Sequence, residues 1–337
     1  MNVLALGGTR FVGRHIAGEL TRGGHRVVCF HRGVTKCELP QNVEERFGDR
    51  SVDLNTVSGE YWDAILDVNC YEPEQMRRSV ELRANWYLMI SSVNVYSDLS
   101  IRGVSENAAT MESFDSDDPS LQYGGKKAAC ERLLLERYPQ RSTILRPGLI
   151  VGKWDYTGRF AYWCGRMLRG GRVLAPGPCD RLIQFIDAAD LARFAERAVA
   201  NQIHGIFNVV GPAKPTTIET LLNDSASAAA ERGAPDSTIA WADEAFLLEN
   251  NVQPWTEMPL WLPDAQWRGV LEINNAKALA AGLNLRPIRE TVRSVMDWLP
   301  ANEIPQNIGT SPARESELLA RYDALRTTAF TESRSIR

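Results

Sequence analysis

The chain has 337 residues, with 38 Lys and Arg against 42 Asp and Glu, a formal net charge of −4 and a pI near 5.7. This length allows one large domain or two modest ones. The slight excess of acidic residues gives no overall positive charge that would attract nucleic acid. The apolar runs are short and interrupted by charged residues, so we expect no transmembrane helix. The six cysteines form no Cys-x-x-Cys pair, so we expect no metal site, and reduced thiols in a cytoplasmic protein.

Strand-like and helix-like segments alternate from residue 2 onward. An apolar run over 2–6 leads into Gly7-Gly8, and residues 11–22 space apolar side chains at helical intervals. Further strands are expected over 26–31, 43–47, 64–68, 87–91 and 142–145, with helical stretches between most of them. This alternation predicts an α/β fold, a Rossmann-type doubly wound parallel sheet with helices on both faces.

The pattern changes after Pro147, where loops lengthen and six of the nine tryptophans lie between residues 154 and 267. We expect a strand over 205–210, a helix over 218–232, a helix that ends in ETVRSVMDWL, and an amphipathic helix over 312–326. The predicted domains are the doubly wound domain over 1–150, to which about 180–212 also contributes, and a smaller cap with C-terminal helices over 151–330.

The stretch GGTRFVG, residues 7–13, has the features of a dinucleotide-binding loop. A tight turn after a strand brings the backbone close to a pyrophosphate, and the following helix directs its N–H groups at the anion. Arg10, however, stands where such loops usually have their middle glycine, and an ordinary strand–turn–helix is the alternative. The candidate cofactor residues in this loop are Gly7, Thr9, Arg10, Phe11, Val12 and Gly13.

The end of the second expected strand, VVCFHRG, bears on the choice of cofactor. NAD-preferring loops place an acidic residue there for the ribose 2′-hydroxyl, and this stretch has none. Arg32 and Arg10 are suited to a 2′-phosphate. We therefore expect NADP, with NAD as the alternative. Arg10 covering the adenine or forming a surface ion pair is an equal alternative for that residue.

Two further motifs, YLMISSVNVYSD and LQYGGKKAACERLL, carry candidate catalytic residues. Tyr123 and Lys127 are four residues apart, so they share one face of a helix. Together with GGTRFVG and RPGLIVG, in this order, these motifs resemble the short-chain dehydrogenase/reductase superfamily. The likeness is greatest to its extended or atypical branch, the NAD(P)-dependent epimerase/dehydratase family, and it covers about residues 1–299.

This resemblance implies a Ser-Tyr-Lys relay. Tyr123 would be the acid/base, Lys127 would lower the pKa of Tyr123 and hold the nicotinamide ribose, and Ser92 would bind the substrate oxygen. Ser92 is preferred to Ser91 because the serine of the family stands three residues before the valine of a Val-Tyr pair, here Val95. A phenol with a pKa of about 10 needs a nearby cation to act as a base near neutral pH.

The resemblance also implies weaker assignments elsewhere. Further cofactor candidates are Asp49, Val68, Pro147 and Ile150, although the fourth strand ends in LDVNC, unlike the family's usual small residues. Aromatic side chains beside arginines suit a sugar or nucleoside, with simple packing as the alternative. The substrate candidates are Trp154, Arg159, Arg181 and Gln184, with Lys153 and Asp155 beside them and Trp255 and Trp261 as a lid. Asp187 and Asp190 are expected to have a packing role.

The combined prediction is an NAD(P)-dependent oxidoreductase or epimerase that acts on a carbinol or ketone of a sugar- or nucleoside-like small molecule. The sequence does not separate net reduction from epimerisation or dehydration. With Arg10 in it, the loop resembles that of a subgroup of the family that includes the chloroplast stem-loop RNA-binding proteins. Two alternatives therefore stay open: RNA binding, and cofactor sensing without turnover. We expect no nucleic acid or membrane partner, and a homodimer is allowed.

Overall fold

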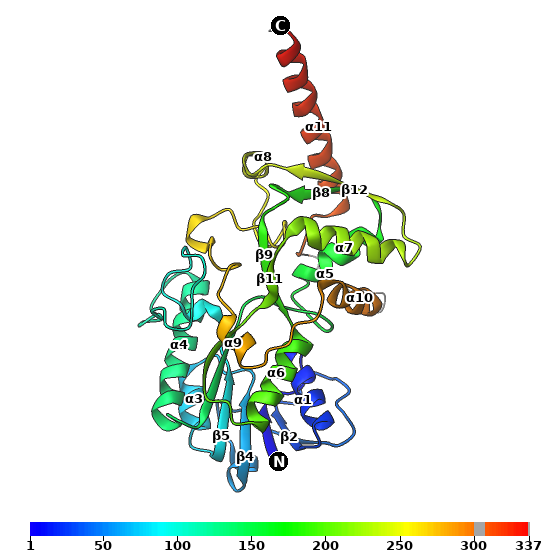
Figure 1. The fold of residues 1–337 in the computed structure, drawn as a ribbon. Coiled ribbons are helices and arrows are strands. Elements are labelled where there is room, and N and C mark those ends of the chain that lie inside the picture. Colours follow the sequence, from blue (N-terminus) through cyan, green and yellow to red (C-terminus); the bar gives the residue numbers. More distant parts are fainter. Residues whose placement is uncertain (300–306, 336–337) are drawn as a thin grey trace. The chain divides into compact units, whose positions relative to one another are not determined.

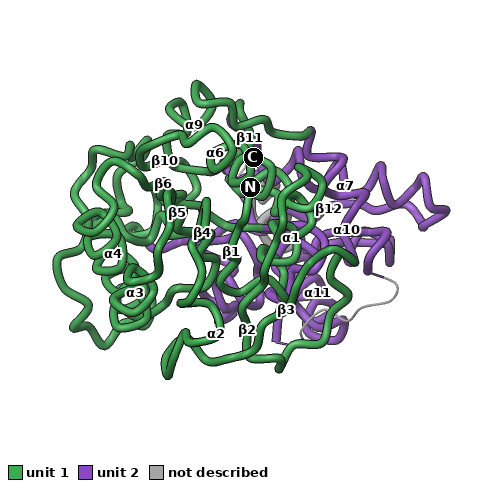
Figure 2. The backbone as a smooth tube through the Cα atoms, turned by 90° about the horizontal axis from the view of Figure 1, so that it is seen from below, with its two compact units in different colours: residues 1–150, 184–214, 265–286 green, residues 151–183, 215–264, 287–337 purple. Residues whose placement is uncertain are grey.

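The computed structural model describes residues 1–299 and 307–335, and the chain divides into two compact units (Figure 2). Unit 1 comprises residues 1–150, 184–214 and 265–286, and unit 2 comprises residues 151–183, 215–264 and 287–337. The second stretch of unit 1 lies close to the range of about 180–212 expected from the sequence. The return of residues 265–286 to unit 1 was not predicted, because that segment has little regular secondary structure to reveal its partner.

Unit 1 is built on a seven-stranded sheet in the order β10-β6-β5-β4-β1-β2-β3. All neighbouring strands in it are parallel, which confirms the predicted doubly wound fold. Its strands are β1 (Asn2–Leu6), β2 (Arg26–His31), β3 (Val43–Phe47), β4 (Tyr61–Asp67), β5 (Arg83–Ile90), β6 (Ser142–Pro147) and β10 (Gly205–Val209). Two strands begin earlier than predicted, since β4 and β5 include residues whose side chains are exposed.

Helices cover both faces of this sheet (Figures 1 and 2). Helices α1 (Val12–Arg22) and α6 (Ala188–Ala200) pack together on one face, and α3 (Pro73–Ser79) and α4 (Pro119–Arg137) pack together on the other. The short helices α2 (Asn55–Ser58) and α9 (Ala276–Ala280) and the 3₁₀ turns η1 (Val93–Val95) and η2 (Ala265–Trp267) complete the unit.

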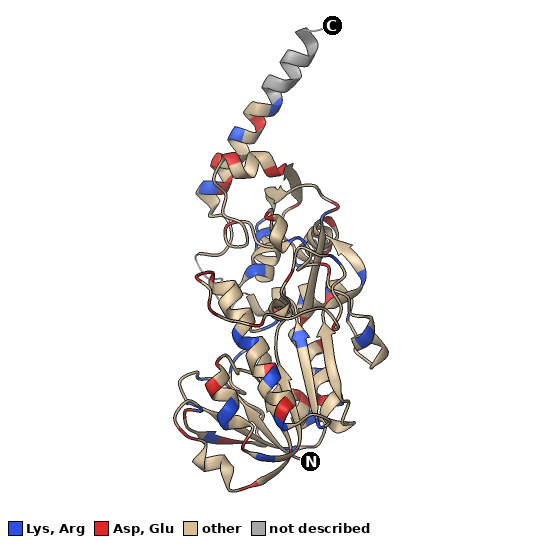
Figure 3. Cartoon of the chain, turned by 90° about the vertical axis from the view of Figure 1, so that its left-hand side faces the viewer, with Lys and Arg blue, Asp and Glu red and all other residues tan. Residues whose placement is uncertain are grey.

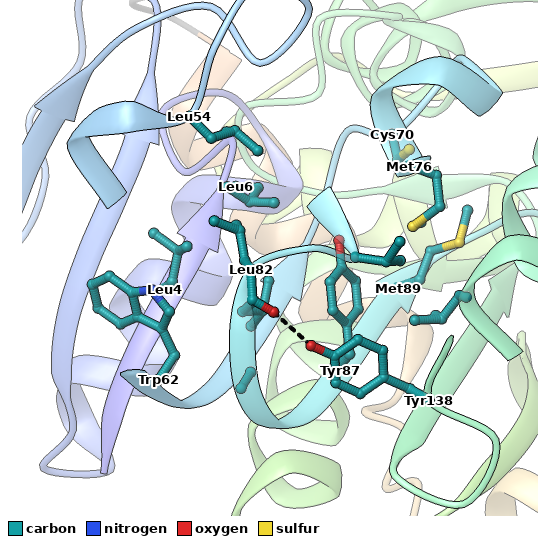
Figure 4. Close-up of a cluster of buried hydrophobic side chains, with 14 of the residues drawn as sticks. Leu4, Leu6, Leu54, Trp62, Cys70, Met76, Leu82, Tyr87, Met89 and Tyr138 are labelled. Carbon is teal, nitrogen blue, oxygen red and sulfur yellow. Dashed lines mark hydrogen bonds between the residues drawn. The ribbon is translucent and has the colours of Figure 1, made fainter. Parts of the chain in front are cut away.

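A hydrophobic core fills the space between the sheet and helices α3 and α4 (Figure 4). Leu4 and Leu6 come from β1 and Met76 comes from α3, and all three are fully buried. Tyr138 donates a hydrogen bond to the carbonyl of Leu82 over 2.7 Å, which satisfies the polar atom of a ring in this core. This packing holds the carboxyl ends of β1, β4 and β5 at one edge of the sheet.

Unit 2 contains a two-stranded parallel sheet and several helices. The strands are β8 (Gly171–Pro176) and β12 (Ser237–Ala242). The helices are α5 (Arg159–Leu168), α7 (Ile218–Ala230), α8 (Glu244–Glu249), α10 (Ile288–Trp298) and α11 (Pro312–Ser335). The chain passes between the units within β7 (Ile150–Val151), β9 (Leu182–Asp187) and β11 (Gly211–Thr217), which pair in the order β11-β9-β7.

Basic and acidic residues are interspersed along the chain, and α11 carries both signs (Figure 3). Within the residues that the structure describes, no helix is long and apolar enough to cross a bilayer.

Candidate cofactor and catalytic site

The loop between β1 and α1 forms a cradle that side chains would fill. Gly7 has φ of +85°, which favours glycine, and a β-carbon on Gly13 would lie 2.3 Å from the carbonyl oxygen of Gly7. Phe11, just before α1, is a non-glycine residue at φ of 41°. The N-terminus of α1 therefore follows a tight, glycine-containing turn after β1, and the residues present fit a dinucleotide pyrophosphate. Arg10 is exposed and Thr9 is half-buried in this loop.

The end of β2 carries His31 and Arg32. The Gly33 N–H donates to His31 Nδ1 over 3.1 Å, so Nε2 is the nitrogen that donates to Glu45 over 2.9 Å. The Arg32 side chain is exposed. Asp49 accepts a hydrogen bond from the Ser51 N–H over 2.8 Å. In the structure, therefore, Asp49 stabilises a turn.

A buried ion pair involves Asp67, the last residue of β4. Arg50 donates to both carboxylate oxygens of Asp67, over 2.5 and 2.6 Å, and both residues are buried. Tyr87 donates to the same carboxylate over 2.7 Å, and burial together with the Asp67 charge raises the pKa of Tyr87, so its hydroxyl stays protonated. Sequence reasoning missed this group. The only signal was an arginine directly after Asp49 and an aspartate at the end of the apolar run Ala64–Leu66.

The predicted serine, tyrosine and lysine all lie at the carboxyl edge around β5. Lys127 in α4 is 2% exposed and donates to the Ile90 carbonyl at the end of β5 over 2.9 Å. Its ammonium lies 6.0 Å from the centroid of the Tyr123 ring and 4.8 Å from that of Tyr71. Ser92 follows β5 and its Oγ accepts a hydrogen bond from the Asn94 N–H over 3.1 Å. Tyr71 was not predicted.

Two glycines allow α4 to approach this edge closely. A β-carbon on Gly124 would lie 2.0 Å from the Asn94 carbonyl oxygen, and one on Gly125 would lie 2.2 Å from the Ser113 carbonyl oxygen. The sequence YGGKK therefore places Tyr123 and Lys127 on a helix whose backbone touches the segment that follows Ser92.

A second buried ion pair joins Arg146 of β6 to Glu131 of α4. Arg146 donates to both carboxylate oxygens of Glu131, over 3.0 and 2.5 Å, and Ser91 donates to Glu131 over 2.5 Å. The Arg146 guanidinium lies 4.9 Å from the ring centroid of Tyr96, whose hydroxyl donates to Asn208 over 2.7 Å. The Ser91 hydroxyl is thus directed into the interior.

The remaining candidate residues of unit 1 differ in burial and in hydrogen bonding. Pro147 is buried at the end of β6, and Ile150 is half-buried three residues later. Val68 is half-buried, and its N–H donates to the Leu6 carbonyl over 3.1 Å. Gln184, a substrate candidate, exchanges two hydrogen bonds with the backbone of Ile273, over 2.9 and 2.8 Å. Its amide therefore fixes a loop of unit 1.

In unit 2, Trp154 and Arg159 lie next to other charged or aromatic groups. The Arg159 guanidinium lies 5.2 Å from the centroid of the Trp255 ring, and the Lys153 ammonium lies 5.0 Å from that of Trp154. Asp155 is 2% exposed, and burial raises its pKa to about 6. Its Oδ2 has no hydrogen-bond partner within the residues described.

Arg181 and Trp261, by contrast, have structural contacts in unit 2. Arg181 pairs with Glu244 over 2.7 Å and donates to the Leu262 carbonyl over 3.4 Å. Trp261 is fully buried, unlike the exposed ring expected of a lid. Asp187 and Asp190 of unit 1 both pair with Arg286, over 3.5 and 2.8 Å, at the start of α6.

The seven-stranded parallel sheet of unit 1, with helices on both faces, is a doubly wound fold of the Rossmann type. The model of the NAD dependent epimerase/dehydratase family matches residues 74–210, a range that contains Ser92, Tyr123 and Lys127. The match confirms the resemblance predicted from the motifs. The family is one of NAD-dependent enzymes, and the comparisons give no support to the expected preference for NADP.

Three similar proteins illustrate the relationship. The chloroplast stem-loop binding protein of 41 kDa b from Arabidopsis thaliana is 26% identical over 257 residues, which are 70% of this chain and 65% of that protein. The chain therefore matches less than two thirds of that relative's length.

The solved UDP-N-acetylglucosamine 4-epimerase from Bacillus cereus is 15% identical, with a TM-score of 0.64, over 90% of this chain and 99% of its own. The Bordetella bronchiseptica enzyme WbmH, solved in complex with NAD+, is 16% identical, with a TM-score of 0.66, over 88% of this chain and 97% of its own. At these identities the likeness to the two solved structures establishes the fold alone.

Proposed function

We propose that this chain is an NAD(P)-dependent enzyme that oxidises or reduces a carbinol or ketone through Ser92, Tyr123 and Lys127. The observation that carries the proposal is the position of Lys127. Its ammonium is buried beside the Tyr123 ring, and its hydrogen-bond partner Ile90 offers a neutral carbonyl rather than a carboxylate. The positive charge is therefore available to stabilise a phenolate at Tyr123 and to bind a ribose hydroxyl.

The glycine loop and the N-terminus of α1 would hold the pyrophosphate of the dinucleotide. Hydride exchange with the substrate carbon is the chemistry that a bound nicotinamide supplies. Tyr123 would remove the hydroxyl proton of a carbinol during oxidation and return a proton during reduction. Ser92 would donate to the same substrate oxygen. The interior hydrogen bond of Ser91 to Glu131 supports Ser92 as the residue available to the substrate.

The test is the variant Tyr123→Phe. The phenylalanine ring keeps the packing against Tyr71, whose centroid lies 6.3 Å away, so folding and cofactor affinity should be retained. Turnover should fall by about 10²–10⁴, as expected for a lost general acid/base. The matched control is Tyr61→Phe, which removes an exposed hydroxyl bonded to Asn85 and should leave turnover unchanged. Near-normal turnover in Tyr123→Phe would refute the catalytic assignment.

The proposed substrate is a sugar- or nucleoside-like small molecule. Support comes from Arg159 over the Trp255 ring, a pairing that suits an anionic or hydroxylated ligand with a planar part. The 4-epimerase from Bacillus cereus, by its name, acts on a UDP-sugar. A panel of UDP-sugars, followed by product chromatography with NAD+ and with NADP+, separates epimerisation from net oxidation. Conversion of none of them would contradict this substrate class.

The proposed cofactor is NADP, with NAD as the alternative. No acidic residue follows β2, and the exposed Arg32 at that position is suited to a 2′-phosphate.

A second candidate function is RNA binding on the same scaffold. It is favoured by the 26% identity to a protein whose name describes stem-loop binding. Electrophoretic mobility shifts with a stem-loop RNA at about 0.15 M salt test it. Tight RNA binding, combined with turnover that does not depend on Tyr123, would replace the enzymatic proposal.

A further inference from the structure

Asn69, two residues after the end of β4, brings a side-chain amide to the glycine loop. A β-carbon on Gly7 would lie 2.6 Å from Asn69 Oδ1 and 2.8 Å from Asn69 Nδ2. The amide of Asn69 therefore lies directly against the Cα of Gly7. The side chain is exposed at this edge of the sheet, so a ligand in the glycine loop would meet it.

A rigid buried group determines how this amide is turned. Arg50 donates through Nη1 to Asn69 Oδ1 over 3.2 Å. The same guanidinium is held by both oxygens of Asp67, and it donates to Ser79 Oγ over 2.6 Å. A guanidinium held by three partners has little rotational freedom. Because Oδ1 accepts from Arg50, the amide presents its Nδ2 donors to other partners.

The location is the point where the strand order reverses. Strands β1 and β4 are neighbours, with Leu6 opposite Asp67, and the sheet continues to β2 on one side and to β5 on the other. Ligands of open α/β sheets bind at this switch point, outside the carboxyl ends of the strands. Gly7 follows one of the two central strands, and Asn69 follows the other.

We propose that Asn69, oriented by the Arg50–Asp67 ion pair, donates a hydrogen bond to the diphosphate group of a bound dinucleotide. This inference rests on the proposed function, since it assumes that a dinucleotide binds the loop. The Asn69 side chain supplements a loop in which Arg10 occupies the place of the middle glycine. Asn69 is a ligand-binding residue in this proposal, and Arg50 and Asp67 are positioning residues.

The decisive variant is Asn69→Asp. An aspartate has the same shape and can pair with Arg50, so the variant should fold with an unfolding temperature at or above that of the unaltered protein. Its second oxygen would face the diphosphate with a negative charge and without a donor. We expect the affinity for NAD+ and for ADP-ribose, measured by isothermal titration calorimetry, to fall about 10- to 100-fold. ADP-ribose contains the diphosphate but no nicotinamide, so this readout is independent of Ser92, Tyr123 and Lys127.

Salt and a control variant separate this effect from a structural one. The loss in Asn69→Asp should shrink as the salt concentration rises toward 1 M, because screening weakens the repulsion between exposed charges. Asn85→Asp is the matched control, since it makes the same charge change at an exposed position near the amino end of β5. Its affinity for both ligands should be unchanged.

The outcomes distinguish this inference from the function on which it rests. Failure of the unaltered protein to bind NAD+, NADP+ or ADP-ribose would overturn both. Binding by the unaltered protein with equal affinity in Asn69→Asp would overturn the role of Asn69 alone. A loss of affinity in Asn69→Asp that is accompanied by a matching loss in Asn85→Asp, or that does not respond to salt, would also overturn it.

Discussion

The buried pair Arg50–Asp67 makes a strong prediction about stability. In Arg50→Met the guanidinium is removed, and the Asp67 carboxylate, which is 0% exposed, is left without its counter-charge. Breaking a buried ion pair in this way costs about 3–5 kcal/mol. For a domain of about 150–250 residues, each kcal/mol shifts the unfolding temperature by about 2–4 °C. The expected decrease is therefore about 6–20 °C, measured by differential scanning calorimetry.

A second substitution tests whether the uncompensated charge is the cause. In Arg50→Met/Asp67→Asn the buried negative charge is removed, while an amide oxygen remains to accept the hydrogen bond from Tyr87. This double variant should recover at least about half of the lost unfolding temperature, because the neutral amide is much cheaper to bury than a carboxylate. A decrease of under about 2 °C in Arg50→Met, or no recovery in the double variant, would refute the reasoning.

Two further predictions concern a buried acid and the cofactor. Burial raises the pKa of Asp155 from 3.8 to about 6. The Asp155 carboxyl therefore binds a proton more tightly in the native state than in the unfolded state. Its contribution to stability is lost as the pH rises from about 4 through 6. The free energy of unfolding of Asp155→Asn, minus that of the unaltered protein, should therefore increase between pH 4 and pH 7 by up to about 3 kcal/mol. Denaturant titrations that give the same difference at every pH would contradict this prediction. Arg32→Ala should weaken NADP+ binding about 10- to 100-fold, through loss of a charge-assisted hydrogen bond, and leave NAD+ binding unchanged. Calorimetric titration showing that the unaltered protein binds NAD+ as tightly as NADP+ would overturn the NADP preference.

The sequence alone predicted the features that depend on local patterns. Apolar runs of strand length, alternating with helical spacing, identified the central strands of unit 1 and hence the doubly wound sheet. The glycines of the opening loop and the four-residue spacing of Tyr123 and Lys127 are also local, because they concern one turn and one helix. For the same reason the family resemblance was visible in short motifs.

Only the tertiary structure decided which side chains meet across elements. Arg50 pairs with Asp67, and Glu131 pairs with Arg146, because strand register and helix packing bring together residues that no local period relates. Arg181 has the residue type of a ligand-binding group, yet in the structure it is engaged by Glu244. Asn69 shows the converse, since an exposed asparagine after a strand has no distinctive pattern. The role proposed for Asn69 depends on its contact with Gly7, which follows the neighbouring strand β1, and such contacts depend on the sheet as a whole.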